Sequence, residues 1–158
     1  RFVRGNTRWP LPNVWIGVSA EDQATADERI PILLQTPAAV RWVSYEPALG
    51  PVSFSRWLPS WESTVAGRRF GRDVVIQSRR DSELHWIVVG GESGPGARPF
   101  DLAWARQTIA QCKAAGVPVF VKQLGAKHGL VWKRKDRKGG DMAEWPDDLR
   151  IREFPRKP

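Results

Sequence analysis

The stretch Leu84-His-Trp-Ile-Val-Val-Gly-Gly-Glu-Ser-Gly-Pro-Gly96 indicates the fold class of this chain. It holds an apolar run typical of a buried strand, Leu84–Val89, then a carboxylate and a glycine-rich loop. Three other runs rich in Val, Ile and Trp lie at Val14–Ala20, Val40–Tyr45 and Val117–Val121. None of the four alternates cleanly between apolar and polar residues. This pattern favours parallel strands covered by helices.

Helical patterns lie between these runs. The clearest covers Leu102 to Ala115, with an apolar face that includes Cys112 and with Asp101 and Gly116 as its caps. We therefore expect Cys112 in the core and not as a reactive thiol. Residues 22–36 predict a second helical segment, in which Thr25-x-x-Glu28 forms a capping box and Pro31 divides the segment into two short helices.

We expect one domain over residues 1–158, with a core at 10–125. An insertion at about 52–83 is predicted to leave the sheet as a basic excursion, for which a hairpin is one option, and residues 126–158 form a basic loop and tail. Four apolar tail residues are expected to anchor it on the domain: Trp145, Leu149, Ile151 and Phe154. Trp15, Trp42, Trp86 and Trp104 are expected to pack, whereas Trp57, Trp61 and Trp132 are candidate stacking surfaces for which burial is still favoured.

Four strand–helix units in this length fit half of a TIM-like (β/α) barrel, since a complete barrel takes about 250 residues. The competing architecture is an open, doubly wound sheet. The chain starts without methionine, which suggests the C-terminal part of a larger barrel. In that case its strand edges must pair with the missing half or with another copy, and the chain alone should dimerise or dissolve poorly.

The chain has a net charge of +8 and a pI of about 10.4, and its positive charge is concentrated in two segments. Residues 68–80 carry five Arg and one Asp, and residues 122–138 carry seven Lys or Arg and one Asp. Solvated loops and a phosphate-binding surface are both open interpretations. The candidate nucleic-acid contacts are Arg68, Arg69, Arg72, Arg79, Arg80, Lys127, Lys133, Arg134, Lys135, Arg137 and Lys138.

Several classes of protein are excluded or disfavoured by composition. A single cysteine excludes an intramolecular disulfide framework and fits a reducing compartment, so a cytoplasmic location is expected. No stretch approaches the ~18 apolar residues of a membrane helix. His85 and His128 suggest neither a catalytic triad nor a metal site, and no metal is expected.

The ends of the strands are the strongest functional signal. Glu21, Glu46 and Glu92 follow three strands in the same period-two register, and Lys122 and Gln123 follow the fourth. Ligands of parallel α/β sheets sit beyond the carboxyl ends of the strands, so these side chains are expected to converge. The candidate ligand-binding residues are Ser19, Glu21, Ser44, Glu46, Gly90, Gly91, Glu92, Ser93, Lys122 and Gln123. No catalytic residue is assigned.

A purely structural explanation of the three acidic residues stays open, because a carboxylate is stabilised by the dipole of a helix that begins after it. It explains Glu21 well, but Glu46 poorly, because Pro47 follows directly. The glycine-rich loop after Val89 is either an anion-binding loop or only a tight turn, because it lacks the spacing of a nucleotide fingerprint.

Several motifs resemble the C-terminal half of the phage three-cysteine-motif proteins, an uncharacterised family of phages, prophages and bacteria. They are Asn13-Val-Trp-Ile-Gly-Val-Ser-Ala-Glu21, Ala24-x-x-Asp-Glu-Arg-Ile-Pro31, Pro37-Ala-Ala-Val-Arg-Trp-Val-Ser-Tyr-Glu-Pro47, Leu49-Gly-Pro51, Val88-Val-Gly-Gly-Glu-Ser-Gly-Pro-Gly-Ala-Arg-Pro99, Gln111-Cys112 and Lys122-Gln123. The resemblance covers residues 10 to 125, and the string around Glu92 is its most specific part.

The resemblance implies a barrel similar to that of radical S-adenosylmethionine enzymes, with an iron–sulfur cluster held by three cysteines of the full-length protein. This chain lacks those cysteines, so it should carry no cofactor and be inactive alone. Two hypotheses follow. The favoured one is the substrate-side half of such a barrel, which binds a polar or anionic ligand at the strand ends; the other is a phage accessory protein that binds nucleic acid without catalysis.

Overall fold

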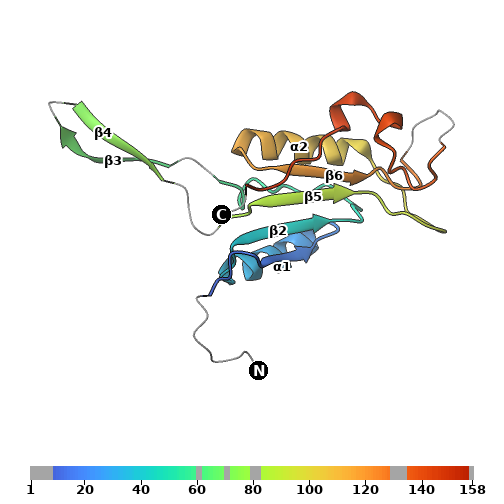
Figure 1. The fold of residues 1–158 in the computed structure, drawn as a ribbon, viewed down its shortest axis with the longest axis horizontal. Coiled ribbons are helices and arrows are strands. Elements are labelled where there is room, and N and C mark those ends of the chain that lie inside the picture. Colours follow the sequence, from blue (N-terminus) through green and yellow to red (C-terminus); the bar gives the residue numbers. More distant parts are fainter. Residues whose placement is uncertain (1–8, 60–61, 70–71, 79–82, 129–134, 157–158) are drawn as a thin grey trace, which may run out of the picture.

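A computed structural model gives the fold of the chain (Figure 1) and describes residues 9–59, 62–69, 72–78, 83–128 and 135–156, with the backbone alone at 62–69 and 72–78. The elements are β1 (Trp15–Ser19), α1 (Gln23–Gln35), β2 (Val40–Tyr45), β3 (Glu62–Arg69), β4 (Arg72–Ser78), β5 (Trp86–Gly90), α2 (Leu102–Ala115) and β6 (Val119–Gln123). Short 3-10 helices follow at Met142–Glu144 and Asp147–Leu149.

Four strands form an all-parallel sheet in the order β1-β2-β5-β6. Ser19 lies opposite Ser44, and Trp42 lies opposite Trp86, so the strands run side by side in close register. The predicted α/β class is therefore confirmed. The order follows the chain without the reversal that marks a doubly wound sheet, and it is compatible with a partial (β/α) barrel.

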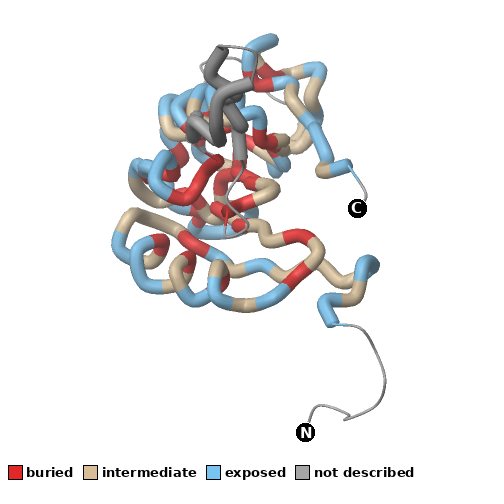
Figure 2. The backbone as a smooth tube through the Cα atoms, turned by 90° about the vertical axis from the view of Figure 1, so that its left-hand side faces the viewer, coloured by how far each residue is buried: buried red, intermediate tan, exposed pale blue. Residues whose placement is uncertain are grey.

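The two helices lie on the same face of this sheet. Ile30 and Leu33 of α1 and Leu102 and Ala105 of α2 belong to one core cluster with the inward residues of the strands, which are Val43, Tyr45, Ile87, Val89, Val119 and Val121. Figure 2 shows the buried positions gathered in the interior of the fold. Burial of this shared apolar layer is the main stabilising contribution to the domain.

The described residues of the connection between β2 and β5 contain no helix. The first part of this connection instead packs into the core at the position where a helix would lie in a regular strand–helix–strand unit. Phe54, Trp57 and Leu58 are buried, and the Phe54 ring packs edge-on against Tyr45 with centroids 5.6 Å apart. Gln111 of α2 holds this segment, because its Oε1 accepts the Phe54 N–H at 2.6 Å and its Nε2 donates to the Val52 carbonyl at 3.1 Å. Trp57 is therefore a core residue and not a stacking surface, in line with the interpretation favoured from the sequence.

The prediction that Pro31 divides the first helical segment is wrong. Residues 23–35 form a single helix with Pro31 inside it, although proline cannot donate the backbone hydrogen bond of that position. Ile30 and Leu33 on either side of Pro31 are buried against the sheet, and this packing outweighs the local cost. The capping box also lies earlier than predicted, with Asp22 as N-cap and Thr25 as its reciprocal partner.

The second helix agrees with its prediction. Asp101 caps its N-terminus by accepting the Ala103 N–H, and Gly116 has a left-handed backbone with φ of 65°. Cys112 is fully buried, as expected for a core residue.

The face of the sheet opposite the helices carries a band of aromatic side chains. Trp15, Trp42, Trp86 and Phe120 lie on successive strands, and Trp86 contacts the other three rings at centroid distances of 5.5–6.1 Å. The three tryptophans pack, as predicted, but on one another and on Phe120, and all four side chains stay partly exposed. We call Trp15, Trp42, Trp86, Phe120 and Phe154 the aromatic band.

The inserted excursion contains an antiparallel hairpin, β3–β4, as expected. Its pairing has an irregularity between Val65 and Gly67. Figure 1 shows the hairpin extending from the side of the sheet where the strands begin, away from their carboxyl ends.

The tail covers the outer edge of β6. The Val121 N–H donates to the Ile151 carbonyl at 2.8 Å, and the Glu153 N–H donates to the Val119 carbonyl at 3.0 Å. Trp145 and Leu149 are buried and Ile151 packs against the core, which confirms three of the predicted anchors. Phe154 is 60% exposed, although its ring contacts Trp86 and Phe120.

Candidate functional site

The carboxyl ends of the four parallel strands are tied together by backbone hydrogen bonds. The Leu49 N–H donates to the Glu21 carbonyl at 2.8 Å, the Ala48 N–H to the Gly90 carbonyl at 2.9 Å, and the Gly91 N–H to the Gln123 carbonyl at 3.0 Å. The loops that follow the strands therefore form one connected edge. The backbone ends of the four strands therefore lie side by side, and the convergence of their side chains on one ligand site stays a prediction.

Glu46 is the side chain on which this edge converges. Its Oε2 lies 2.8 Å from the Lys122 ammonium, and its Oε1 accepts a hydrogen bond from Gln123 Nε2 at 3.0 Å. The Glu46 side chain is only 14% exposed, whereas that of Lys122 is 53% exposed. Gln123 also donates to the Gly91 carbonyl at 3.0 Å. The mostly buried Glu46 carboxylate is thus paired with a cation and an amide, both from β6.

A local irregularity in β5–β6 pairing makes this contact possible. The register shifts between Val89 and Gly90, so that Gly90 lies opposite Gln123. Consecutive strand residues otherwise point to opposite faces, but Lys122 and Gln123 both reach Glu46 here. A Cβ at Gly90 would lie 3.5 Å from the Glu46 carboxyl carbon and 3.2 Å from the Gln123 carbonyl oxygen. Glycine therefore leaves the space across which Glu46 reaches β6.

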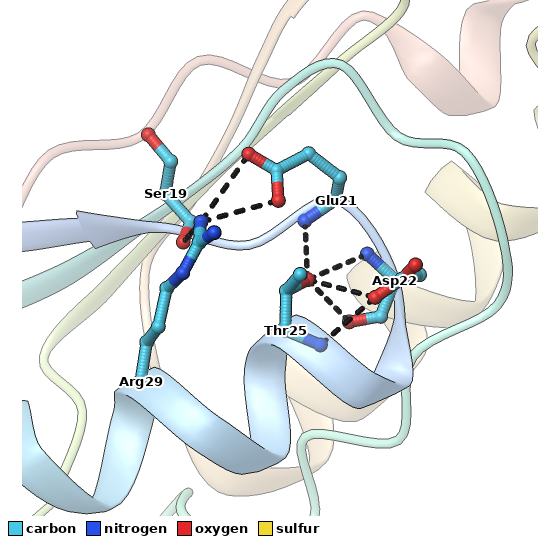
Figure 3. A network of polar contacts seen from close by, with 5 residues as sticks. All are labelled: Ser19, Glu21, Asp22, Thr25 and Arg29. Atoms are coloured by element: carbon cyan, nitrogen blue, oxygen red, sulfur yellow. Dashed lines mark hydrogen bonds and ion pairs between the residues drawn. The ribbon is translucent and has the colours of Figure 1, made fainter.

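Glu21 pairs with the helix that follows its own strand. Arg29 of α1 donates to the Ser19 carbonyl at 2.8 Å and lies 3.2 Å from Glu21 Oε2. Figure 3 shows the Glu21 carboxylate turned toward this guanidinium, while the Glu21 N–H donates to Thr25 Oγ1 at 2.9 Å. The backbone hydrogen bond from Thr25 is the main reason why the pKa of Asp22, the N-cap, lies below its usual value.

Glu92 is held within its own loop. Arg98 makes a two-pronged contact of 2.9 Å to each Glu92 oxygen, and the Arg98 backbone N–H donates to Oε2 at 2.8 Å. These bonds, the side-chain ones first, lower the pKa of Glu92 to about 2. They also raise the pKa of Arg98, and Glu21 adds to that effect through its charge. Both carboxylates therefore lie within electrostatic reach of one guanidinium.

The remaining predicted residues lie on or next to this edge. Ser19 is exposed, and Ser44, its partner in the register, is partly buried. Gly91 is buried, and a Cβ there would meet Phe100 Cβ at 2.9 Å, so its role is close packing of the loop. Ser93 is exposed. None of these placements tests ligand binding, which stays a prediction.

Sequence reasoning missed Arg29 and Arg98. Both stand in segments that had been singled out, eight residues after Glu21 and six after Glu92. An arginine at that distance from a strand-end carboxylate was the available signal. In both pairs the charge of the carboxylate is balanced by a guanidinium group from the same part of the chain.

Those candidate nucleic-acid residues that the structure describes lie in separate places and do not form one cluster. Arg79, Arg80, Lys133 and Arg134, and also Trp61 and Trp132, lie outside the described residues. The backbone of Arg68, Arg69 and Arg72 lies at the β3–β4 end of the hairpin, which Figure 1 shows on the side away from the carboxyl ends of the parallel strands. Lys135, Arg137 and Lys138 are exposed in the loop before the tail. Lys127 lines a pocket of about 550 Å³ with Phe100 and Trp104.

The chain does not fit an iron–sulfur cluster. Its single cysteine, Cys112, is a buried residue of α2, and its burial raises the pKa of the thiol to about 12. Among the described residues no three His, Cys, Asp or Glu side chains are grouped as a metal site would require.

In the same part of the chain no helix has the length and apolar character needed to span a membrane.

A family model described as "Protein of unknown function (DUF5131)" matches residues 1–147. No curated protein and no solved structure matches the chain.

Proposed function

This chain belongs to the DUF5131 family, whose description assigns no activity, and we propose from the geometry of the site that it binds a small polar or anionic ligand at the carboxyl ends of β1, β2, β5 and β6. The observation that carries the proposal is the contact of Glu46 with Lys122 and Gln123 across β5. Parallel α/β sheets bind their ligands at this edge.

The chemistry of the cluster indicates what the ligand offers. Lys122 is more than half exposed, and its ammonium group has three donors, of which Glu46 takes one. An anionic group such as a phosphate or a carboxylate suits the other donors. The Ser19 hydroxyl on the same edge is exposed and adds a further donor or acceptor. Glu46 holds the ammonium in place, so we assign Lys122 to ligand contact and Glu46 to positioning.

We also propose that the sheet is the substrate-side half of a (β/α) barrel, and that the resemblance to phage three-cysteine-motif proteins reflects common descent. The sequential strand order and the placement of both helices on one face support the barrel. A cluster would have to be held outside this chain, because Cys112 alone does not provide its ligands.

The experiment is a titration of the 158-residue chain followed by two-dimensional NMR, with inorganic phosphate and S-adenosylmethionine as the probes. We expect shifts confined to the residues around Glu46, Gly91 and Lys122 with at least one probe, and their loss in Lys122→Ala. Lys113→Ala is the matched control, because Lys113 is an exposed lysine of α2. Absence of shifts with both probes, or equal losses in the two variants, would refute the proposal.

A further inference from the structure

We propose that a pocket at the N-terminal end of α2 binds a free aromatic amino acid in its zwitterionic form. The pocket has a volume of about 550 Å³, within the range of about 300–1,000 Å³ that small-molecule sites occupy. Its lining does not include Glu46, Lys122 or Gln123. The inference therefore goes beyond the proposed ligand site and does not depend on it.

The pocket is built by the loops that follow two neighbouring strands, β5 and β6. The Phe100 N–H, just before α2, donates to the Lys127 carbonyl at 2.7 Å. The Ala126 N–H donates to the Glu92 carbonyl at 2.8 Å, so the two loops are joined at two points. Phe100 and Leu102 belong to the core between the sheet and the helices. The pocket thus lies on the helix side of the sheet, and a barrel completed by further strands would leave it open.

The buried part of the lining consists largely of rings. Phe100, Leu102 and His128 are buried, and Trp104 is partly buried. The Phe100 and Trp104 rings meet edge to face at 63°, with centroids 6.2 Å apart. A third aromatic ring can join such a pair, because both offset and edge-to-face contacts between rings are favourable. This side of the pocket suits the side chain of an aromatic ligand.

Two opposite charges at the rim of the pocket indicate the polar part of the ligand. Lys127 and Asp101 both line the pocket and are exposed. Among the residues that the structure describes, the Lys127 ammonium has no hydrogen-bond or ion-pair partner. One Asp101 oxygen accepts the Ala103 N–H at 2.8 Å, which leaves the other for a ligand. Arg106, the nearby cation of α2, is paired with Asp148 at 2.6 Å.

An α-amino acid carries the two charges that this rim complements. Its carboxylate suits the Lys127 ammonium and its ammonium group suits the second Asp101 oxygen, and both contacts are charge-assisted hydrogen bonds. Its aromatic side chain then packs on Trp104. A ligand with a single charge would leave either Lys127 or Asp101 without a partner. The pocket therefore selects a zwitterion over an aromatic acid or an aromatic amine.

The test is a titration of the 158-residue chain with L-phenylalanine, followed by two-dimensional NMR of the indole N–H groups of its nine tryptophans. We expect a saturable shift of the Trp104 signal, which the variant Trp104→Phe assigns. The Trp42 and Trp86 signals should not move, because these side chains lie on the other face of the sheet. Absence of a Trp104 shift up to the solubility limit of the amino acid would refute the proposal.

Two ligands that each lack one charge separate the two contacts. Hydrocinnamate has the ring and the carboxylate, and phenethylamine has the ring and the ammonium group. Lys127→Ala should weaken binding of L-phenylalanine and hydrocinnamate about fivefold and leave phenethylamine unchanged. Asp101→Asn keeps a side chain that caps α2 and should weaken L-phenylalanine and phenethylamine instead. Lys113→Ala, at the other end of α2, is the matched control.

The pattern of losses distinguishes recognition of the zwitterion from other outcomes. The proposal fails if both variants weaken all three ligands equally, as a general loss of structure would. It also fails if neither variant differs from Lys113→Ala. Adenosine monophosphate is the remaining probe: if it shifts the Trp104 signal and L-phenylalanine does not, the pocket holds a nucleotide and the proposal is wrong.

Discussion

Trp42 lies in the space that the missing side chain of Gly17 leaves on the neighbouring strand: a Cβ at Gly17 would come within 2.6 Å of the indole nitrogen. The two residues face each other in the register of β1 and β2. Trp42 in turn packs on Trp86, with ring centroids 5.5 Å apart. A glycine on an edge strand therefore positions the aromatic side chains of two further strands.

Gly17→Ala should destabilise the chain, because the added methyl group forces the Trp42 ring to move against Trp86. Overpacking of this kind costs about 1–3 kcal/mol. Urea denaturation measures the free energy of unfolding. Gly50→Ala is the control, because a Cβ at Gly50 would meet its nearest neighbour, Asp22 Cβ, at an ordinary 3.7 Å. Equal stability of the two variants would contradict the assigned role of Gly17.

The Glu92–Arg98 pair predicts a carboxyl group that titrates far below its ordinary pKa of 4.5, at about 2. A lowered pKa in the folded state adds stability above pH 4.5, and this contribution is lost as the pH falls toward 2. The measurement is the pH dependence of the Glu92 carboxyl carbon signal in NMR. Arg98→Ala should move the midpoint up toward 4.5. A midpoint near 4.5 in the unmodified chain would rule out the pairing in solution.

Gln111 fixes the segment that replaces a helix between β2 and β5. Gln111→Ala leaves the Phe54 N–H and the Val52 carbonyl without their partner. An unsatisfied buried polar group costs about 1–3 kcal/mol, so we expect a loss of stability in that range by thermal or urea denaturation. Gln107→Ala, on the exposed side of the same helix, is the matched control and should change little. The idea is wrong if both variants unfold alike.

Cys112 should not react in the native chain. Burial raises its pKa to about 12, so the thiolate is scarcely populated at pH 8 and the sulfur is covered by the core. Ellman's reagent should label the thiol only after the protein is unfolded in guanidinium chloride. Labelling of the native chain at the rate of a free thiol would show that α2 opens readily.

Much of the fold followed from local patterns in the sequence. The apolar runs predicted the four parallel strands to within two residues at each end, because both faces of such strands avoid water. Asp101 and Gly116 predicted the bounds of α2, because capping depends on the residue type at one position. Pro31 misled the prediction because a local penalty was outweighed by burial of Ile30 and Leu33 against residues far away in the sequence.

The sequence by itself determined that acidic side chains and a lysine stand at the carboxyl ends of parallel strands, since strand direction and period two depend only on local pattern. Only the tertiary structure decided how they pair. The register shift at Gly90 brings Lys122 and Gln123 together on Glu46. Arg29 forms an ion pair with Glu21, and Arg98 forms one with Glu92. The packing of both helices on one face likewise left the aromatic band on the other. Register and layering depend on contacts between distant segments, which no local pattern contains.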